Sequence, residues 1–306
     1  MKKRIGVIGS INTDFVCKTS TLPQVGETVT GEDFIINHGG KGANEAVACA
    51  RLGASVNILG CVGDDMFSKN AIANLLHEGV HVTAVEQLKN CKGGIANINL
   101  CNGNNQIIVI PGANARLDIS YIKKYSSRIL ECSIVGCQFE VSTKALLYAS
   151  KLCKDNNIPL VLNPSPIKEY SQELFDNAAY VIVNELEITH IEGYNPLNGE
   201  QILKKYPNKL ILTLGSQGVK YFDGINIVSI PAIKTKVVDT TGAGDTFLGA
   251  FMVAINNGMA ISQAIMFANI SAGLKTTKLG AQTGMPTLDE VKHYIKKNKL
   301  NLEINF

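Results

Sequence analysis

The chain has 306 residues, of which 45% are hydrophobic, and its formal net charge is +3 at pH 7. This length and composition accommodate one large α/β domain with a sizeable core and a small appended element. The weak, dispersed positive charge argues against a nucleic-acid partner, and no apolar run approaches the roughly 20 residues that span a membrane.

The first predicted element is a short buried strand at 5–9, after which the polar residues Asn12 and Asp14 follow. Open α/β sheets bind their ligands at the carboxyl ends of such strands. An amide and a carboxylate at this place suit two neighbouring sugar hydroxyls, although a polar turn after a strand is an alternative explanation. The β-rich but polar stretch 26–37 predicts an exposed strand pair.

A glycine-rich motif follows and precedes a helix that is predicted at 41–52. Gly40, Lys41 and Asn44 lie at its start, where bare backbone can approach a ligand and the lysine can reach a sugar hydroxyl or a transferred phosphate. The motif is not a Walker loop, because glycine and not serine or threonine follows Lys41. By helical spacing, Glu45 points away from the ligand-facing edge.

The middle of the chain alternates between short apolar runs and helical stretches, which predicts a doubly wound, mostly parallel sheet flanked by helices. Between 91 and 110, two strands joined by an Asn-Gly turn predict a hairpin. Strands are expected at 55–59, 95–100, 106–110, 133–137, 159–162, 180–183 and 209–214. Helices are expected at 64–77, 142–154, 199–206, 260–275 and 288–297.

Residues 239–247 read Asp-Thr-Thr-Gly-Ala-Gly-Asp-Thr-Phe and lead into a further helix. The backbone amides of Gly242, Ala243, Gly244 and Asp245 are expected to form an anion hole at the start of this helix, where the helix dipole favours a phosphate. Because like charges repel, the Asp245 carboxylate beside it suits proton abstraction from a group that attacks a phosphate. A loop with a helix N-cap is the alternative for these residues alone.

This string resembles the C-terminal motif of the ribokinase-type (PfkB) carbohydrate kinases, and residues 38–53 resemble the N-terminal glycine motif of the same family. The resemblance runs from Ile5 to about Pro286. It implies a ribokinase-like α/β fold over 1–306, in which inserted segments at about 14–37 and 91–110 form a lid over the substrate. A sheet of so few strands is poorly buried, so we expect a homodimer in which the lid packs against a second copy.

The resemblance implies an ATP-dependent sugar kinase with Asp245 as the catalytic base and O5 of D-ribose as the expected acceptor. The implied sugar ligands are Asn12, Asp14, Gly40, Lys41, Asn44, Glu140 and Asp245. The implied nucleotide contacts are Asn184, Thr213, Gly215, Ser216, Gly218, Gly244 and Asn269.

Two kinds of metal are implied as well. Glu187 is associated with Mg²⁺ on the ATP phosphates, directly or through water. An activating K⁺ is implied in a loop that offers mainly backbone carbonyls, from Asp239, Thr241, Lys275, Lys278, Gly280 and Gly284. At this loop the chain departs from the family pattern, because Gly284 replaces a frequent hydroxyl residue and the two lysines lie close by.

The charges of the expected sugar site favour a neutral acceptor. A kinase of an already phosphorylated sugar needs arginines or clustered lysines for the second phosphate. None of the arginines lies in the two lid segments, whereas the carboxylates of Asp14 and Glu140 would repel a phosphate. Fructose, a 2-keto-3-deoxy sugar and a nucleoside remain alternatives to ribose.

Two other functional classes are alternatives to a kinase. A nicotinamide-dependent dehydrogenase is disfavoured, because the first glycine turn, at 6–9, lacks the Gly-x-Gly-x-x-Gly pattern. A non-catalytic sugar-binding protein is expected to lack the base or the anion hole, and both motifs are present. Fold alone does not distinguish it from an enzyme.

The cysteines and the N-terminus indicate a cytoplasmic location. Eight cysteines are spread along the chain without a Cys-x-x-Cys pair, mostly within apolar stretches, so reduced thiols are expected. Residues 1–4 lead directly into a short apolar run and not into a signal-peptide core.

Overall fold

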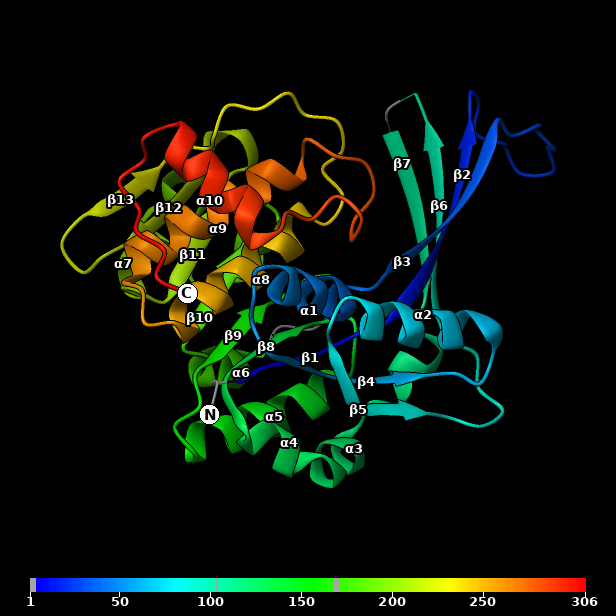
Figure 1. Cartoon of the computed structure of the whole chain (residues 1–306), viewed down its shortest axis with the longest axis horizontal. Helices are drawn as coiled ribbons and strands as arrows, with labels where there is room; N and C mark the ends of the chain where they lie inside the picture. The colour runs from blue at the N-terminus through cyan, green and yellow to red at the C-terminus, as the bar shows by residue number, and fades with distance from the viewer. Residues whose placement is uncertain (1–3, 103, 168–170) are drawn as a thin grey trace.

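The computed structural model describes residues 4–102, 104–167 and 171–306. Residues 1–3, on which the expectation about a signal peptide depends, and Gly103 of the expected hairpin turn lie outside the described residues. The described residues form a large sheet covered by helices and a smaller sheet that rises from one side of it (Figure 1).

The strands of the large sheet are β1 (Arg4–Ile8), β4 (Val56–Val62), β5 (His81–Gln87), β8 (Cys132–Gln138), β9 (Leu160–Asn163), β10 (Tyr180–Val183), β11 (Leu210–Thr213), β12 (Val219–Phe222) and β13 (Ile227–Ile230). Within the described residues their order is β13-β12-β11-β10-β9-β8-β1-β4-β5. Every adjacent pair from β11 to β5 is parallel, and β12 and β13 are antiparallel. The strand order reverses between β1 and β8, which is where doubly wound sheets bind ligands.

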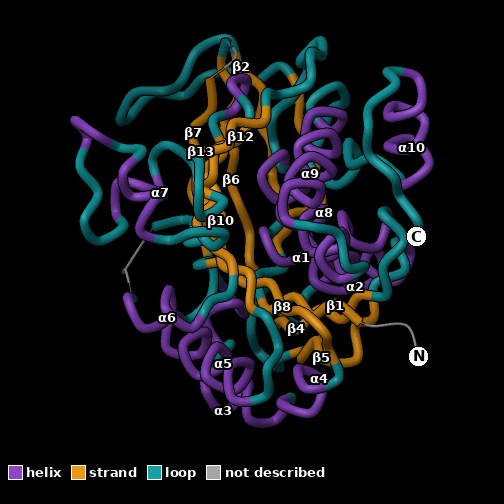
Figure 2. The backbone as a smooth tube through the Cα atoms, turned by 90° about the vertical axis from the view of Figure 1, so that its left-hand side faces the viewer, coloured by secondary structure: helices purple, strands orange, loops and turns teal. Residues whose placement is uncertain are grey.

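Helices cover both faces of this sheet (Figure 2). One apolar core includes buried residues of α1, α8, α9 and α10, and the other includes buried residues of α3 to α7. The helices are α1 (Lys41–Arg51), α2 (Met66–His77), α3 (Ile119–Lys124), α4 (Ser126–Leu130), α5 (Thr143–Asp155), α6 (Gln172–Asn177), α7 (Gln201–Lys205), α8 (Ala243–Asn256), α9 (Ile261–Lys275) and α10 (Leu288–Lys297).

The small sheet has the order β3-β2-β6-β7 and stands beside the body of the molecule (Figure 1). Its strands are β2 (Asn12–Thr19), β3 (Asp33–Gly39), β6 (Gly94–Cys101) and β7 (Asn104–Ile110). β2 pairs in parallel with β6, whereas β3 and β7 flank them in antiparallel orientation. Val16, Ala96 and Ile98 form its small buried cluster.

Several details differ from the sequence-based expectations. The expected strand pair at 26–37 is a single strand, β3, and its partner is β2. Asn12 and Asp14 therefore lie within a strand of the small sheet, where the polar side chains that enter the site hide the usual apolar alternation. β12 and β13 were not predicted, because both are short strands of mixed burial, and β13 lies at the edge of the sheet. In the described part of the chain, no helix combines the length and apolarity needed to cross a membrane.

Candidate active site

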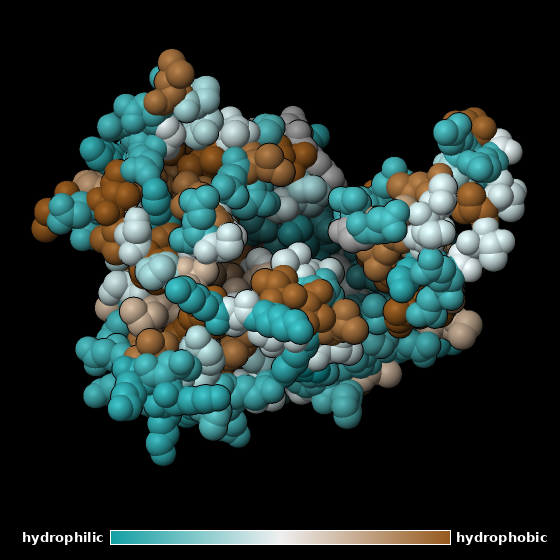
Figure 3. All heavy atoms as spheres, turned by 90° about the horizontal axis from the view of Figure 1, so that it is seen from above, coloured by the Kyte–Doolittle hydropathy of each residue, from teal (hydrophilic) through white to brown (hydrophobic). Residues whose placement is uncertain are grey.

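The candidate site lies at the edge where the large sheet meets the small one. The carboxyl ends of β1 and β8 and the N-termini of α1 and α8 come together at this edge. The Ser10 hydroxyl donates to the Glu140 carboxylate, and the Asn44 amide donates to the Asp245 carboxylate. A view from above shows a recess between the small sheet and the helical body, with hydrophilic residues inside it (Figure 3).

Asp245 lies in the first turn of α8, a turn that depends on Gly242. Gly242 is the N-cap residue and has φ +77°, a conformation that glycine adopts without strain. The Asp245 side chain is nearly buried, at 7% exposed. Its carboxylate accepts a hydrogen bond of 2.7 Å from Asn44 Nδ2 and lies 3.5 Å from Lys41 Nζ.

The backbone beside Asp245 offers free donors. The Ala243 N–H bonds to the Thr240 carbonyl at 3.1 Å. The N–H groups of Gly244 and Asp245 have no acceptor among the described residues. Unpaired amides at a helix N-terminus attract anions, so the second half of the expected anion hole is available for a phosphate, whereas Ala243 is already engaged.

A chain of side-chain amides orients Asn44. Asn74 Nδ2 donates to Gln282 Oε1 at 2.7 Å, and Gln282 Nε2 donates to Asn44 Oδ1 at 3.0 Å. Asn44 then donates to Asp245. Because each amide uses its oxygen for one neighbour and its nitrogen for the next, the NH₂ end of Asn44 faces the carboxylate.

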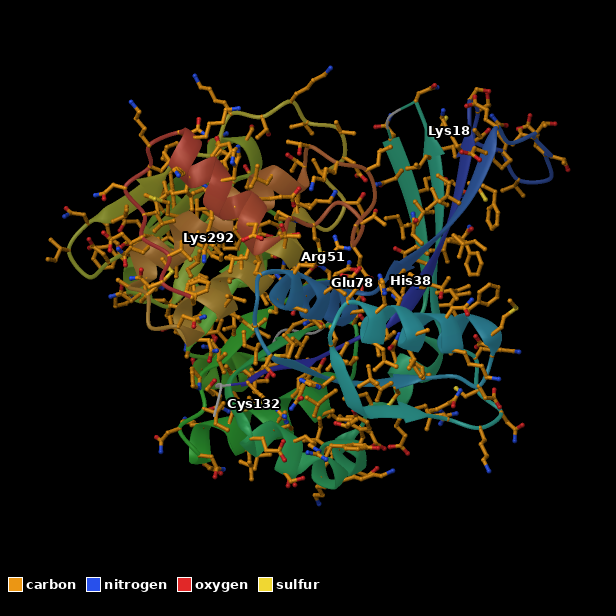
Figure 4. The ribbon with its side chains drawn as sticks, viewed as in Figure 1. Lys18, His38, Arg51, Glu78, Cys132 and Lys292 are labelled. Atoms are coloured by element: carbon orange, nitrogen blue, oxygen red, sulfur yellow. The ribbon has the colours of Figure 1, made fainter. Side chains whose placement is uncertain are left out.

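An arginine ties together the elements that carry this chain of amides. Arg51, at the end of α1, donates to both oxygens of the Glu78 carboxylate from Nε and Nη2, at 2.7 and 2.6 Å. It also donates to the Met285 carbonyl at 2.9 Å. Figure 4 shows Arg51 and Glu78 directed toward one another beside α2. The paired geometry therefore fixes α1 against the end of α2 and against the loop that contains Gln282.

The small sheet contributes Asn12 and Asp14 to the site. Asn114 Nδ2 donates to Asn12 Oδ1 at 2.7 Å, so the donor end of Asn12 is left for a ligand. The Asp14 carboxyl lies directly against Gly39, since a Cβ on that glycine would fall 2.2 Å from one of its oxygens. Gly40 has φ +88° and packs on the backbone of Asn12. The glycine pair therefore lets β2 approach the start of α1 closely.

Glu140 follows β8 and points to the start of α1. Its Oε2 accepts hydrogen bonds from the Ser10 hydroxyl and, at 3.2 Å, from the Lys41 N–H. A carboxylate at a helix N-terminus is stabilised by the helix dipole. Glu140 is thus engaged with the protein through Oε2, and its Oε1 accepts no hydrogen bond from the described residues.

Burial, together with neighbouring carboxylates, raises the pKa of Asp14. Burial is the largest cause, followed by the carboxylates of Glu140 and Asp245, and together they raise the pKa from the usual 3.8 to about 7. Near neutral pH the free protein therefore holds Asp14 in both protonation states. A ligand that donates hydroxyl hydrogen bonds to it favours the ionised form.

Lys41 is the positive group among these carboxylates. Burial lowers the pKa of its amine, but the carboxylates of Asp245, Glu140, Glu187 and Glu45, in that order, outweigh this effect, so the pKa is raised. Glu45 is fully buried and bonded to Gln138. Burial also raises its pKa well above the usual value, so it favours the neutral form.

The expected nucleotide residues follow neighbouring strands of the large sheet. Asn184 follows β10, and Thr213, the last residue of β11, donates to the Val183 carbonyl at 3.1 Å. Gly215, Ser216 and Gly218 form the turn that comes next. Asn269 lies apart from them on α9, and its Nδ2 donates to the Pro231 carbonyl at 2.7 Å. Its amide therefore holds the segment after β13 and leaves its oxygen and its second N–H for another partner.

Glu187 is the residue available for magnesium. Its carboxylate accepts from Asn163 Nδ2 at 3.2 Å, from the Asn184 N–H at 3.0 Å and from Asn184 Nδ2 at 3.0 Å. No cluster of three or more His, Cys, Asp or Glu side chains that could hold a metal occurs in the described residues. One buried carboxylate among amides fits Mg²⁺ that keeps its waters and is bound mainly by ATP phosphates.

The loop expected to hold K⁺ contains an ammonium group. Lys275 is fully buried, and its Nζ donates to the Asp239 carbonyl at 2.8 Å. The Asp239 carboxylate accepts from the Thr241 N–H and hydroxyl and from the Gly280 N–H. A lysine nitrogen therefore already binds one of the expected carbonyl ligands, and these residues do not fit an additional monovalent cation. The K⁺ site that the resemblance implies stays a prediction, and these contacts do not support it.

Sequence reasoning missed the residues that orient the expected ligands. Gln282 and Asn74 orient Asn44, Asn114 orients Asn12, and Asn163 binds Glu187. All are neutral amides far in sequence from their partners. Of these amides, only Gln282 lies in a stretch that the sequence marks as functional, namely the loop expected to hold K⁺.

Comparisons with known proteins agree with this geometry. The family model "pfkB family carbohydrate kinase" matches residues 2–288. Ribokinase from Lactococcus lactis is 44% identical over 303 residues, covering 98% of this chain and 99% of its own length. Ribokinase from Bacillus subtilis is 40% identical, covering 96% and 99%. A solved structure of Arabidopsis thaliana ribokinase complexed with ribose and ATP is 28% identical with a TM-score of 0.86, covering 97% and 99%.

Proposed function

The chain belongs to the pfkB family of carbohydrate kinases, and within that family we propose that it transfers the γ-phosphoryl group of ATP to O5 of D-ribose. It is a phosphotransferase with an alcohol group as acceptor. The Arabidopsis relative bound to ribose and ATP supports both substrates. The observation that carries the proposal is the nearly buried Asp245 carboxylate, held by Asn44 beside unpaired helix amides.

Asp245 removes the proton of the attacking hydroxyl. Asn44 and Lys41 hold the two oxygens of its carboxylate, which fixes the direction in which the base faces. The N–H groups of Gly244 and Asp245 then stabilise charge on the transferred phosphoryl group. Mg²⁺, when bound with ATP near Glu187, neutralises phosphate charge.

Charge in the sugar site supports a neutral acceptor. Burial and then the carboxylates of Glu140 and Asp245 raise the pKa of Asp14, so these acidic groups lie close together. A second phosphate on the sugar would meet these carboxylates and be repelled. Hydroxyl groups would instead donate to Asp14 and accept from Asn12. A site built in this way discriminates against sugars that lack one hydroxyl.

The small sheet is proposed to act as the lid and as the surface of a homodimer. Ile35, Ile107 and Val109 are about half exposed. Strand pairing and alternation place them on the face that also contains Asp14. A second copy that covers this face would bury the apolar side chains and exclude water, which competes with the sugar for the phosphoryl group.

The cysteines support a reducing, cytoplasmic location. All eight belong to the described residues and are free thiols, and five of them are buried. Such a distribution is typical of small core residues in a reducing compartment.

The experiment that tests the proposed acceptor is a comparison of kcat/KM by ADP release. Ribose, 2-deoxyribose, fructose, adenosine and fructose 6-phosphate are supplied separately with saturating MgATP. Ribose is expected to give the largest value, and 2-deoxyribose a lower one because it lacks a hydroxyl. A preference for fructose 6-phosphate would contradict the charge argument, and a preference for fructose or adenosine would reject ribose.

A further inference from the structure

Lys275 is the last residue of α9, and its side chain turns inward. It is among the largest fully buried side chains, at 0% exposed. Its Nζ donates to the Asp239 carbonyl at 2.8 Å and lies 3.8 Å from Asp239 Oδ2. A buried charged group requires such partners, so the contacts with Asp239 hold this ammonium inside the loop.

Backbone carbonyls converge on the same place. A Cβ on Gly284 would lie 2.8 Å from the Gly280 carbonyl oxygen and 3.1 Å from both the Lys278 carbonyl oxygen and Lys275 Cε. The end of the Lys275 side chain therefore packs against Gly284, among oxygens that suit a cation. Any larger residue at 284 would push against the lysine. Gly284 and Lys275 thus fit each other as a pair.

The loop connects directly to the anion hole. Asp239 bonds both to Thr241, just before the helix start at Gly242, and to Gly280 across the loop. The backbone N–H groups of Val238 and Asp239 both donate to the Thr276 carbonyl. Burial lowers the pKa of the Lys275 amine, and the carboxylates of Asp239 and Asp245 oppose this effect by favouring the ammonium form. A positive charge at Lys275 therefore orders the segment that presents Gly244 and Asp245 to the phosphate.

We propose that the Lys275 ammonium is a built-in substitute for a monovalent cation in this loop, so that the kinase reaction does not depend on K⁺. A free K⁺ at the Asp239 carbonyl would lie next to the ammonium, and two like charges at that distance repel. The inference rests on the proposed kinase function. It does not depend on which sugar is the acceptor, because any measurable turnover serves.

The first test uses the wild-type enzyme. Turnover is measured at fixed MgATP and fixed ionic strength, with tetramethylammonium chloride replaced stepwise by sodium, potassium or ammonium chloride. Equal rates in all four salts are expected. A rise of about tenfold or more with K⁺ alone, equivalent to about 1.4 kcal/mol, would overturn the proposal.

The second test removes the ammonium, which is expected to make turnover depend on K⁺. The double variant Lys275→Ala with Gly284→Ser removes the ammonium and restores a hydroxyl, which frees the carbonyls for an ion. We expect it to be slow in tetramethylammonium and to be rescued by K⁺, while Lys297→Ala, which removes an exposed positive charge on α10, stays independent of K⁺. A double variant that folds and works equally in both salts would contradict the role of Lys275.

A stability measurement completes the test without any turnover. Ligand that binds only the folded state raises the melting temperature by mass action. K⁺ is therefore expected to raise the melting temperature of the Lys275→Ala variants relative to tetramethylammonium, and to leave the wild type unchanged. An equal rise of the melting temperature in the wild type would show that K⁺ binds beside Lys275. It would reject the proposal that the ammonium takes the place of the ion.

Discussion

The side-chain amide of Gln282 donates a hydrogen bond of 3.0 Å to Asn44 Oδ1, which leaves the NH₂ end of Asn44 for the Asp245 carboxylate. The bond joins the loop after α9 to the first turn of α1. It therefore transmits the position of a distant loop to the base, and Gln282 is a positioning residue.

Replacing Gln282 tests this relationship. Gln282→Ala removes one hydrogen bond, worth about 1 kcal/mol, and lets the Asn44 amide turn, so kcat is expected to fall about tenfold with little change in ATP affinity. Gln282→Glu is expected to be slower still, because its carboxylate attracts the NH₂ end of Asn44 away from Asp245.

The control is Gln263→Ala, which removes an exposed amide from the surface of α9. It is expected to keep the wild-type kcat. Steady-state kinetics of the three variants check this predicted order of kcat values, and the ATP dissociation constants are measured separately. Full turnover by Gln282→Glu would contradict a role for the orientation of Asn44.

Asp14 makes the stability of the sugar-free protein depend on pH. Its folded pKa, about 7, exceeds the usual 3.8, so the folded state holds the proton more tightly, and stability is lost as pH rises from about 4 to 7. Asp14→Asn should therefore unfold like the wild type below pH 4. Above pH 7 it should be more stable by up to about 4 kcal/mol, at 1.36 kcal/mol per pKa unit. Denaturant unfolding at several pH values measures this difference.

Ionised Asp14 lowers the stability of the sugar-free protein, but it is expected to favour sugar binding. Because the carboxylate accepts hydrogen bonds from hydroxyls, kcat/KM for the sugar is expected to rise as pH increases through about 7. In Asp14→Asn this rise should be absent and the sugar should bind more weakly. A wild-type profile that falls over this range would contradict the assignment.

Most of the large sheet was predictable, because its buried strands are continuous apolar runs separated by helices with clear start and stop residues. The small sheet was less so. Polar side chains such as Asn12 and Asp14 face the site from within β2 and interrupt the alternation that signals a strand. β13 lies at the sheet edge, with most of its residues only partly buried, and lacks such a signal as well.

The site was predictable where short motifs carry it. Asp245 and Lys41 belong to glycine motifs at helix starts, and local geometry explains why we expect a phosphate to bind there. The residues that orient them were not predictable, because an amide such as Asn114 or Gln282 has no distinctive spacing. The function of Lys275 also required the structure, since only the fold reveals that its ammonium reaches the carbonyl of Asp239.

The exposed apolar face of the small sheet predicts that two copies of the chain associate through it, and a charge placed on this face should separate them. Ile107→Lys places an ammonium among Ile35 and Val109, and is expected to convert a dimer into a monomer with reduced activity. Sedimentation velocity checks this. Ile98 is a poorer probe, because it belongs to the buried cluster of the small sheet and a charge there would disrupt folding.

The matched control is Leu197→Lys, which places the same charge on an exposed apolar residue of the body. That variant should sediment like the wild type and keep its activity. A wild-type protein that is monomeric and fully active at assay concentrations would reject the dimer.

The central claim is that Asp245 removes the proton of the sugar hydroxyl, and its most direct test is Asp245→Asn. The variant keeps the size of the side chain and the neighbouring helix amides, so ATP should bind nearly as well as to the wild type. We predict that kcat with ribose falls by about 10² to 10⁴, which is typical of a lost general base. A variant that binds ATP normally and retains a tenth of the wild-type kcat would contradict the account.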